Sequence, residues 1–593
     1  MKKIFFLFLF GYTLTGCNQP DQTTATGSNK ELADFFEKYH EEYLSYFPLA
    51  ATYEGDTRYN DRLPLDFSDE YRDKVKSFFQ GNLGQLKKFD RDKLNDNDKL
   101  SYDIFEYMMN INIDGFKFHD NYIPFNQFFA LPLTMGQFGS GESAQPFKTV
   151  KDYDDWLKRV NAFTVWADNS IVYFRKGIAA NTVLPKSLVI KIIPQLTALV
   201  SDSAHVKDNL FYSPVKKIPD SFNVEDKKRL TDAYTKMVNE QISPAYKKLA
   251  DFMRNEYLPK ARTTSGIGAL PDGKAWYEYL VRQQTTTDKT PEEIYTIGLL
   301  EVKRIRGIMD SVKNAVGFKG DLPAFFEYMK TDKKFMPYKT PDEVLAAFHK
   351  IYETMKPNLD KMFNRVPKTR FEIRQTEAFR AASASAEYNQ GTPDGSRPGI
   401  FYVPILDATT FNTTSGMESL FLHEAIPGHH YQISLQQEDT LLPKFRRFGG
   451  QNAYVEGWAL YCESLGKELG LYTDPYQYMG ALGDEMHRAI RLVVDVSIHA
   501  KGMTREEAIK YMMDNEAISE QGATAEIERY MAIPGQALGY KIGALKIREL
   551  RSKYEKELAA KFKIAAFHDE ILKDGSMPLA LLEKKMDEWA KRQ

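Results

Sequence analysis

The sequence predicts a mostly α-helical protein with a small β element. Three segments begin with a threonine that can cap a helix and carry a glutamate three residues later, at Thr290, Thr340 and Thr504. This pattern marks helix starts. In the first two segments a proline follows the threonine, at the position where proline suits the first turn. Apolar residues then recur at helical spacing, as at Ile294 and Ile297. The predicted fold is therefore dominated by amphipathic helices.

The clearest strand pattern is the run GIFYV at residues 399–403, which is flanked by prolines. β-branched and aromatic residues bounded by turn formers are typical of a strand. We predict that Gly399, Phe401 and Tyr402 bind substrate, because an exposed strand can pair with an extended peptide. The alternative is an edge strand that binds no ligand.

The chain is expected to form two lobes around a cleft. Residues 31–390 are predicted to form a helical lobe, and residues 391–593 carry the candidate chemistry. The boundary near residue 390 is soft, and the alternative is one continuous domain. The sequence shows no repeat with a period of about 20–50 residues, so a solenoid is not predicted.

The N-terminus resembles a bacterial export signal. A basic start is followed by a short apolar run and by Leu14-Thr15-Gly16-Cys17, which resembles a lipobox. We predict a signal peptide over residues 1–16, a lipid on Cys17 and a flexible tether over residues 17–30. The alternative is an ordinary signal peptide with an incidental cysteine. The apolar run is shorter than the roughly 20 residues that span a membrane, so the lipid would be the anchor.

The composition indicates a globular protein without nucleic-acid chemistry. Lys and Arg together number 79 and Asp and Glu 81, and aromatic residues make up 13% of the chain. No basic stripe points to a nucleic-acid partner. Only Cys17 and Cys462 are present, so a lipidated protein would have no internal disulfide.

A cluster of histidines and a glutamate predicts a zinc site at residues 423–430, which read HEAIPGHH. Zinc-binding helices commonly carry two histidines four residues apart, and the glutamate after the first acts on water. Here Pro427 takes the place of the second histidine and cannot continue a regular helix. If Pro427 and Gly428 form a two-residue bulge, His429 becomes the second ligand beside His423.

His430 is the rival second ligand. On an undistorted helix it would share a face with His423, but the two Cα atoms would lie about 10 Å apart. That distance is too long for two imidazoles to converge easily, so we prefer His429 and place His430 near the ligands or facing substrate. The remaining alternative is a group of histidines without a metal.

The third ligand is expected from the segment YVEGWALYCE at residues 454–463. A carboxylate within such an apolar segment needs a partner or a metal to offset its desolvation. We predict Glu456 as the ligand and Glu463, on the same face two turns later, as a supporting group or alternate ligand. The alternative is a pair of solvent-facing glutamates.

Four motifs in order resemble the bacterial Domain of Unknown Function family 885. They are HEAIPGHHYQ at 423–432, EGWALY at 456–461, DGSRPGIFYV at 394–403, and RY at 529–530 followed by PGQALGYK at 534–541. Weaker similarity extends from about residue 48 onward. The resemblance implies a zincin-like fold related to metallopeptidases whose third zinc ligand is a glutamate.

A looser resemblance is to the helical angiotensin-converting-enzyme and oligopeptidase group. There an Arg-Tyr pair near the C-terminus supplies a tyrosine that stabilises the tetrahedral intermediate. The resemblance places Arg529 and Tyr530 in this role, with Tyr540 as a further candidate. From the sequence itself, Asp495 is a candidate to orient a ligand histidine, and His499 to donate to substrate. The alternative for these two is a helix-surface pair.

The predicted function is zinc-dependent hydrolysis of peptides in the cell envelope. Zinc would be held by His423, His429 and Glu456, and Glu424 would act as general base. Tyr530 or Tyr540, with His499, would stabilise the oxyanion, and the predicted substrate contacts include Arg529. The alternatives are an amidase or esterase acting on small envelope metabolites, and a non-catalytic binding lipoprotein.

Overall fold

A computed structural model describes residues 28–376, 385–393, 395 and 397–593. This part of the chain is built from helices and one three-stranded sheet, so the mostly helical prediction is confirmed. Cys17, the predicted signal peptide and most of the predicted tether lie outside the described residues. None of the helices in the described ranges combines the length and the apolar character needed to cross a membrane.

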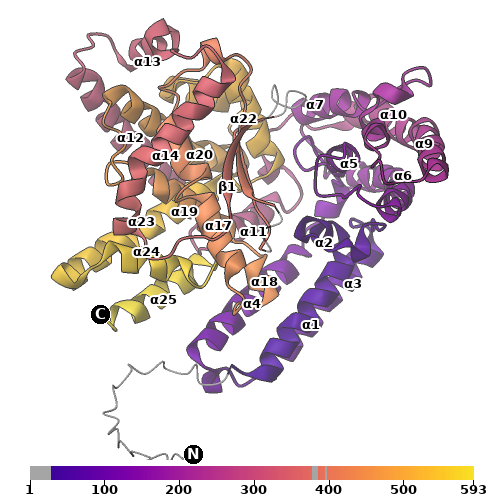
Figure 1. The fold of residues 1–593 in the computed structure, drawn as a ribbon, viewed down its shortest axis with the longest axis horizontal. Helices are drawn as coiled ribbons and strands as arrows, with labels where there is room; N and C mark the ends of the chain where they lie inside the picture. The colour runs from indigo at the N-terminus through magenta and orange to yellow at the C-terminus, as the bar shows by residue number, and fades with distance from the viewer. Residues whose placement is uncertain (1–27, 377–384, 394, 396) are drawn as a thin grey trace, which may run out of the picture.

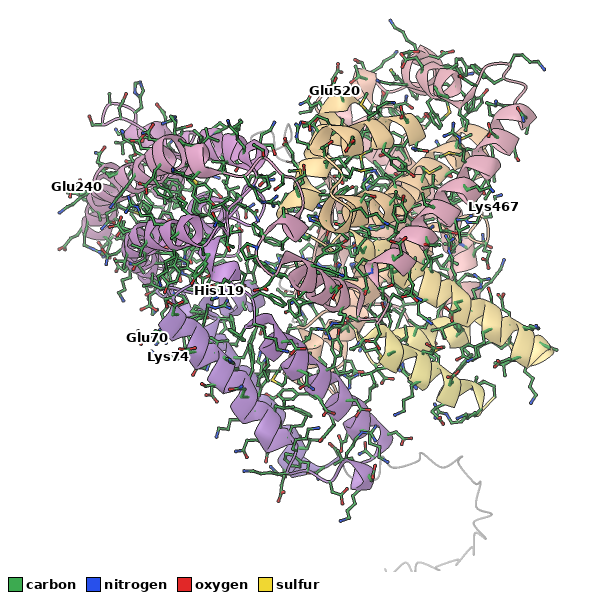
Figure 2. The ribbon with its side chains drawn as sticks, turned by 180° about the vertical axis from the view of Figure 1, so that it is seen from behind. Glu70, Lys74, His119, Glu240, Lys467 and Glu520 are labelled. Atoms are coloured by element: carbon green, nitrogen blue, oxygen red, sulfur yellow. The ribbon has the colours of Figure 1, made fainter. Side chains whose placement is uncertain are left out.

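The first helices form an elongated hairpin-like group at the lower right of Figure 1. Its core is aromatic: the Tyr39 ring stacks on Phe78 and meets the edge of Phe105. On the outer face of α3, seen from behind in Figure 2, Lys74 and Glu70 form an exposed ion pair of 2.7 Å. The helices are α1 (Lys30–Tyr46), α2 (Pro48–Glu54), α3 (Asp69–Leu86) and α4 (Asp96–Gly115).

A second helical group lies above the first, at the upper right of Figure 1. Its longest helix begins with a capping box at Thr149, and its Trp156 and Trp166 are buried in a second core. The helices are α5 (Leu131–Gly139), α6 (Val150–Ala179), α7 (Lys186–Thr197), α8 (Ser213–Lys216), α9 (Val224–Met237) and α10 (Ser243–Phe252).

The next helices cross to the larger body on the left of Figure 1. The helix starts predicted after Thr290, Thr340 and Thr504 are all confirmed, and each threonine accepts a hydrogen bond from the backbone N–H three residues on. The helices of this segment are α11 (Gly273–Thr285), α12 (Pro291–Ala315), α13 (Leu322–Thr331) and α14 (Pro341–Met362).

The sheet consists of β1 (Phe371–Gln375), β2 (Glu387–Asn389) and β3 (Gly399–Val403) in the order β1-β3-β2. β3 is parallel to β1 and antiparallel to β2. The predicted strand therefore exists, but it is the central strand and not an edge. The predicted lobe boundary near residue 390 falls within this sheet, between β2 and β3.

The C-terminal helices surround the candidate site. α19 and α23 pack closely at Gly457 and Gly543, where a Cβ atom on either glycine would clash with the backbone of the other helix. The helices are α16 (Met417–Glu424), α17 (His429–Glu438), α18 (Lys444–Arg447), α19 (Asn452–Glu463), α20 (Pro475–Ala500), α21 (Arg505–Asn515), α22 (Glu520–Ala532), α23 (Leu538–Leu558), α24 (Ile564–Leu572) and α25 (Leu579–Ala590).

Candidate metal centre

The histidine cluster is formed by two helices and the break between them. α16 ends at Glu424 and α17 begins at His429, so the predicted bulge within a single helix is wrong. Proline supplies no backbone N–H to continue α16. Gly428 packs so closely on the carbonyl of His423 that a Cβ atom would clash there. The Trp458 indole donates a 2.9 Å hydrogen bond to the carbonyl of Pro427, which fixes the break against α19.

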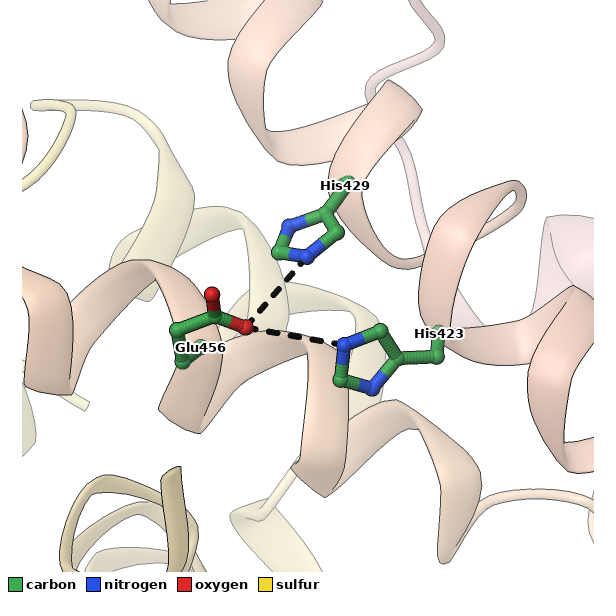
Figure 3. Close-up of side chains that lie close together, drawn as sticks. All are labelled: His423, His429 and Glu456. Carbon is green, nitrogen blue, oxygen red and sulfur yellow. Dashed lines mark ion pairs between the residues drawn. The ribbon is translucent and has the colours of Figure 1, made fainter. Parts of the chain in front are cut away.

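Three predicted ligands converge at this break (Figure 3). The Nε2 atoms of His423 and His429 lie 3.5 and 3.4 Å from Oε2 of Glu456. One ligand atom from each of the three residues lies within 4.8 Å of the others. The structure therefore brings His423, His429 and Glu456 together as the sequence predicted.

The donor set fits a zinc ion. Zinc binds nitrogen and carboxylate ligands at about 2.0–2.2 Å in a tetrahedron, which separates neighbouring ligand atoms by about 3.4 Å. The two distances to Glu456 match this separation. Oε2 of Glu456 is buried and has no hydrogen-bond partner among the described residues. A buried carboxylate oxygen without a hydrogen-bond partner would be stabilised by a bound cation.

Glu463 supports the first histidine. Its Oε1 lies 2.8 Å from Nδ1 of His423, and Arg488 donates to the same oxygen at 3.1 Å. A carboxylate that accepts from one ring nitrogen fixes the tautomer and leaves the other nitrogen for a ligand. The structure thus places Glu463 behind His423, on the side away from Glu456.

His430 points away from the cluster. Its Nδ1 lies 3.0 Å from the Tyr388 hydroxyl of β2, and its ring packs 4.9 Å from that of Phe371 in β1. Burial lowers the pKa of His430 to about 4, so the ring is neutral at physiological pH. Gly399 lies beside it, because a Cβ atom there would approach Nδ1 of His430 to 2.7 Å. His430 therefore joins α17 to the sheet.

Charges in the cluster are strongly coupled. Burial disfavours protonation of His423, but the neighbouring carboxylates of Glu456 and Glu463 raise its pKa to about 10. Burial likewise opposes ionisation of Glu456, and the two histidines nevertheless hold its pKa well below the usual range. Burial raises the pKa of Glu424, at the last position of α16, while His423 and His429 oppose this shift. The cluster is desolvated and favours an ionised Glu456 carboxylate between two imidazoles.

Tyr540 is the tyrosine beside the cluster. Its ring lies 6.4 Å from the His423 ring and almost parallel to it. Arg529 and Gln536 donate long hydrogen bonds to its hydroxyl, at 3.4 and 3.5 Å. The Arg491 guanidinium lies over its ring at 4.7 Å.

Tyr530 is engaged elsewhere. It is fully buried, donates a 2.6 Å hydrogen bond to Glu526 and accepts one from Arg491 at 3.0 Å. Tyr530 and Tyr540 therefore both contact Arg491, and only Tyr540 contacts a predicted ligand among the described contacts. Sequence reasoning could not separate the two tyrosines.

His499 and Asp495 form hydrogen bonds with other parts of the protein and not with the predicted metal ligands. Nδ1 of His499 accepts from the N–H of Ile267, and its Nε2 donates to the carbonyl of Tyr530, both at 3.0 Å. Asp495 accepts from the Tyr277 hydroxyl and from the N–H of Gly535. The predicted orienting role of Asp495 is therefore wrong, since Glu463 binds the ligand histidine. His499 has no ring nitrogen left for substrate.

The strand-addition prediction is also wrong for β3. Pairing with β1 and β2 occupies both of its edges, so no extended peptide can add there. Phe401 is fully buried and packs edge-on against Phe348. Tyr402 lies in register with Glu387 of β2 and Arg374 of β1. β3 thus contacts α16 through the rings of Phe401 and Phe421, which lie 6.3 Å apart, and does not form a peptide-binding edge.

Sequence reasoning missed two arginines of α20. Arg488 binds Glu463, and Arg491 contacts both tyrosines. Arg491 is buried and Arg488 is largely buried on this mostly apolar helix. The sequence signal was two arginines one turn apart in a mostly apolar helix. Buried charges need partners, so this pattern predicts carboxylate or aromatic groups beside them.

The comparisons with known proteins identify the family. A family model described as "Bacterial protein of unknown function (DUF885)" matches residues 48–586. The chain belongs to this family. No curated protein matches the chain significantly.

Two solved structures share the fold over nearly their whole length. A candidate lipoprotein from Colwellia psychrerythraea is 29% identical, with a TM-score of 0.88, covering 96% of this chain and 100% of that one. A candidate lipoprotein of unknown function from Shewanella oneidensis is 20% identical, with a TM-score of 0.72, covering 94% and 99% of the two chains. The mostly helical architecture of this DUF885 member is thus shared with both proteins.

Proposed function

We propose that this DUF885 protein is a zinc-dependent hydrolase, specifically a metallopeptidase of the cell envelope. One observation carries the proposal. The buried ligand atoms of His423, His429 and Glu456 converge at the spacing of zinc ligands, with Glu424 on the same helix end as His423.

His423, His429 and Glu456 would hold the ion and leave a fourth position open, as catalytic zinc sites do. Zinc bound there would lower the pKa of a water molecule toward about 7 and polarise a substrate carbonyl group. Glu463 keeps Nε2 of His423 directed at the site through its 2.8 Å contact with Nδ1.

Glu424 is the proposed general base. It takes the proton from the attacking water and returns it to the leaving amine. Burial raises the pKa of its carboxyl group above the usual value, which brings its proton affinity closer to neutral pH. An adjacent cation would oppose this shift, and the carboxylate would stay ionised for its role as base.

Tyr540 is the proposed oxyanion donor. Its hydroxyl accepts from Arg529 and Gln536, so its own proton is free to be donated to the tetrahedral intermediate. The Arg491 guanidinium packs against the ring at 4.7 Å. We assign no chemistry to Tyr530 or His499, since both are committed to other groups.

The cell envelope is the proposed location. The segment Leu14-Thr15-Gly16-Cys17 resembles a lipobox, and both structural relatives are described as candidate lipoproteins. A lipid on Cys17, with the tether after it, would hold the helical body at a membrane surface.

The proposal is tested by zinc analysis followed by a substrate screen. The purified protein should carry one zinc per chain and cleave members of a random peptide library. Cleavage of small amides or esters without peptide cleavage would favour the amidase or esterase alternative. A protein without stoichiometric zinc or hydrolysis would favour the binding lipoprotein.

A further inference from the structure

The turn before α5 exposes two neighbouring aromatic side chains. Phe128 and Phe129, here called the aromatic pair, are 47% and 65% exposed. Their rings lie 6.2 Å apart in an edge-to-face arrangement. Removing a large aromatic side chain from water lowers the free energy, so an exposed pair of this kind is suited to contact a ligand.

The turn is rigidly built. Oδ1 of Asn126 accepts hydrogen bonds from the N–H groups of Phe128 and Phe129, at 2.8 and 2.7 Å. The Asn126 N–H donates to the carbonyl of Phe129 at 3.0 Å. An asparagine that binds the backbone two and three residues on fixes a turn. The aromatic pair is therefore presented in one backbone conformation, which lowers the entropy cost of binding.

The turn is attached to the helix that borders the candidate site. The side chain of Asn126 donates to the carbonyl of Ala532, and that of Gln127 to the carbonyl of Glu528, each at 3.0 Å. Both acceptors belong to the last turns of α22. Residues some four hundred positions apart in the chain thus form one unit.

A short series of contacts joins the aromatic pair to the metal ligands. The Arg529 guanidinium lies 5.3 Å from the Phe128 ring centre and donates to the Tyr540 hydroxyl. Tyr540 in turn lies beside His423. Arg529 therefore links Phe128 of the aromatic pair to Tyr540, the proposed oxyanion donor.

We propose that the aromatic pair is a specificity subsite that binds an apolar or aromatic side chain of the peptide substrate. This inference rests on the proposed peptidase function. Arg529 acts as a positioning residue that holds Phe128 against the site. Loss of an apolar contact of this size lowers kcat/KM by about 10- to 100-fold.

The test uses zinc-loaded full-length protein and peptides that carry Phe, Leu or Ala at each position in turn. The double substitution Phe128→Ala/Phe129→Ala should lower kcat/KM by about 10- to 100-fold for the preferred Phe or Leu peptides. For the matched Ala peptides the loss should be less than about threefold. The control Tyr53→Ala removes a side chain of similar exposure, 48%, from α2 and should leave both values unchanged.

The outcomes separate the inference from the proposed function. If the wild-type protein cleaves no peptide, the peptidase proposal fails and the subsite falls with it. Suppose that wild type cleaves peptides but that in the double variant kcat/KM falls equally for the Phe, Leu and Ala peptides, or for none of them. Then only the subsite is overturned. A change of oligomeric state in the double variant with unchanged selectivity would likewise overturn it. Zinc content and melting temperature, expected to match wild type, establish that the variant is folded.

Discussion

Oε1 of Glu463 lies 2.8 Å from Nδ1 of His423, whereas the other ring nitrogen, Nε2, faces Glu456. A carboxylate in this position raises the basicity of the imidazole and fixes its orientation. Glu463 is itself buried and held by Arg488. The relationship makes Glu463 the residue through which α20 influences the proposed ligand.

We expect Glu463→Gln to weaken zinc binding by about 10- to 100-fold, the usual cost of losing such a carboxylate. Zinc affinity is measured by competition with a chromophoric chelator. Glu520→Gln, on the surface of α22 (Figure 2), is the matched control and should bind zinc as wild type does. Equal affinity in both variants would refute the supporting role of Glu463.

Glu424→Gln should abolish most hydrolysis and retain the metal. The amide cannot accept a proton, and general base catalysis typically contributes about 100- to 10,000-fold. The ligand atoms belong to other residues, so zinc content should stay at the wild-type level. Turnover of a cleaved peptide and zinc content are measured on the same sample. An active variant would exclude Glu424 as the base.

Tyr540→Phe and Tyr530→Phe should behave differently. The first removes the proposed oxyanion donor and should lower kcat by about 100- to 1000-fold with little loss of stability. The second removes a partner of the half-buried Glu526 and of the buried Arg491 and should lower stability by about 1–3 kcal/mol. Steady-state kinetics and thermal unfolding distinguish them. The reverse pattern would reassign the oxyanion role to Tyr530.

His499 should make the protein sensitive to acid. Burial lowers the pKa of its imidazole from 6.5 to about 3, and one ring nitrogen must stay unprotonated to accept from Ile267. Because the folded pKa lies below the unfolded one, this stability is fully present above pH 6.5 and is lost as the pH falls toward 3. The effect is on the order of 5 kcal/mol.

The measurement is the free energy of unfolding as a function of pH between 7 and about 4. His499→Gln should reduce the pH dependence of the free energy of unfolding by the equivalent of about one proton. This holds whatever the stability of the variant at neutral pH. His349→Gln, on the exposed face of α14, is the control variant, since it likewise replaces one histidine by glutamine. A wild-type slope in His499→Gln would show that this histidine does not titrate on unfolding.

Local chemistry predicted the helices and the ligands well. The starts of α12, α14 and α21 follow from capping residues, which act within one turn of the chain. The preference for His429 over His430 rested on the reach of two imidazoles, and the structure brings His429 to Glu456. These inferences depend on a few neighbouring residues.

Long-range packing could not be predicted in the same way. The place of β3 in its sheet depends on β1 and β2, whose sequences carry weak strand signals. The choice between Tyr530 and Tyr540 depends on where α22 and α23 lie relative to α16, which no local pattern encodes. The same holds for Asp495, whose partners come from α11 and from the turn before α23.

The contact between α19 and α23 at Gly457 and Gly543 has a mechanical consequence. Glu456 immediately precedes one of these glycines, and Tyr540 lies one turn before the other. With the two backbones in direct contact, the carboxylate and the phenol belong to one stiff body. The histidines lie on a second body, α16 and α17, which meets the first at His423 and Glu463 and at Pro427 and Trp458. Relative movement of the bodies would therefore alter the grip on the ion while preserving the distance between carboxylate and phenol.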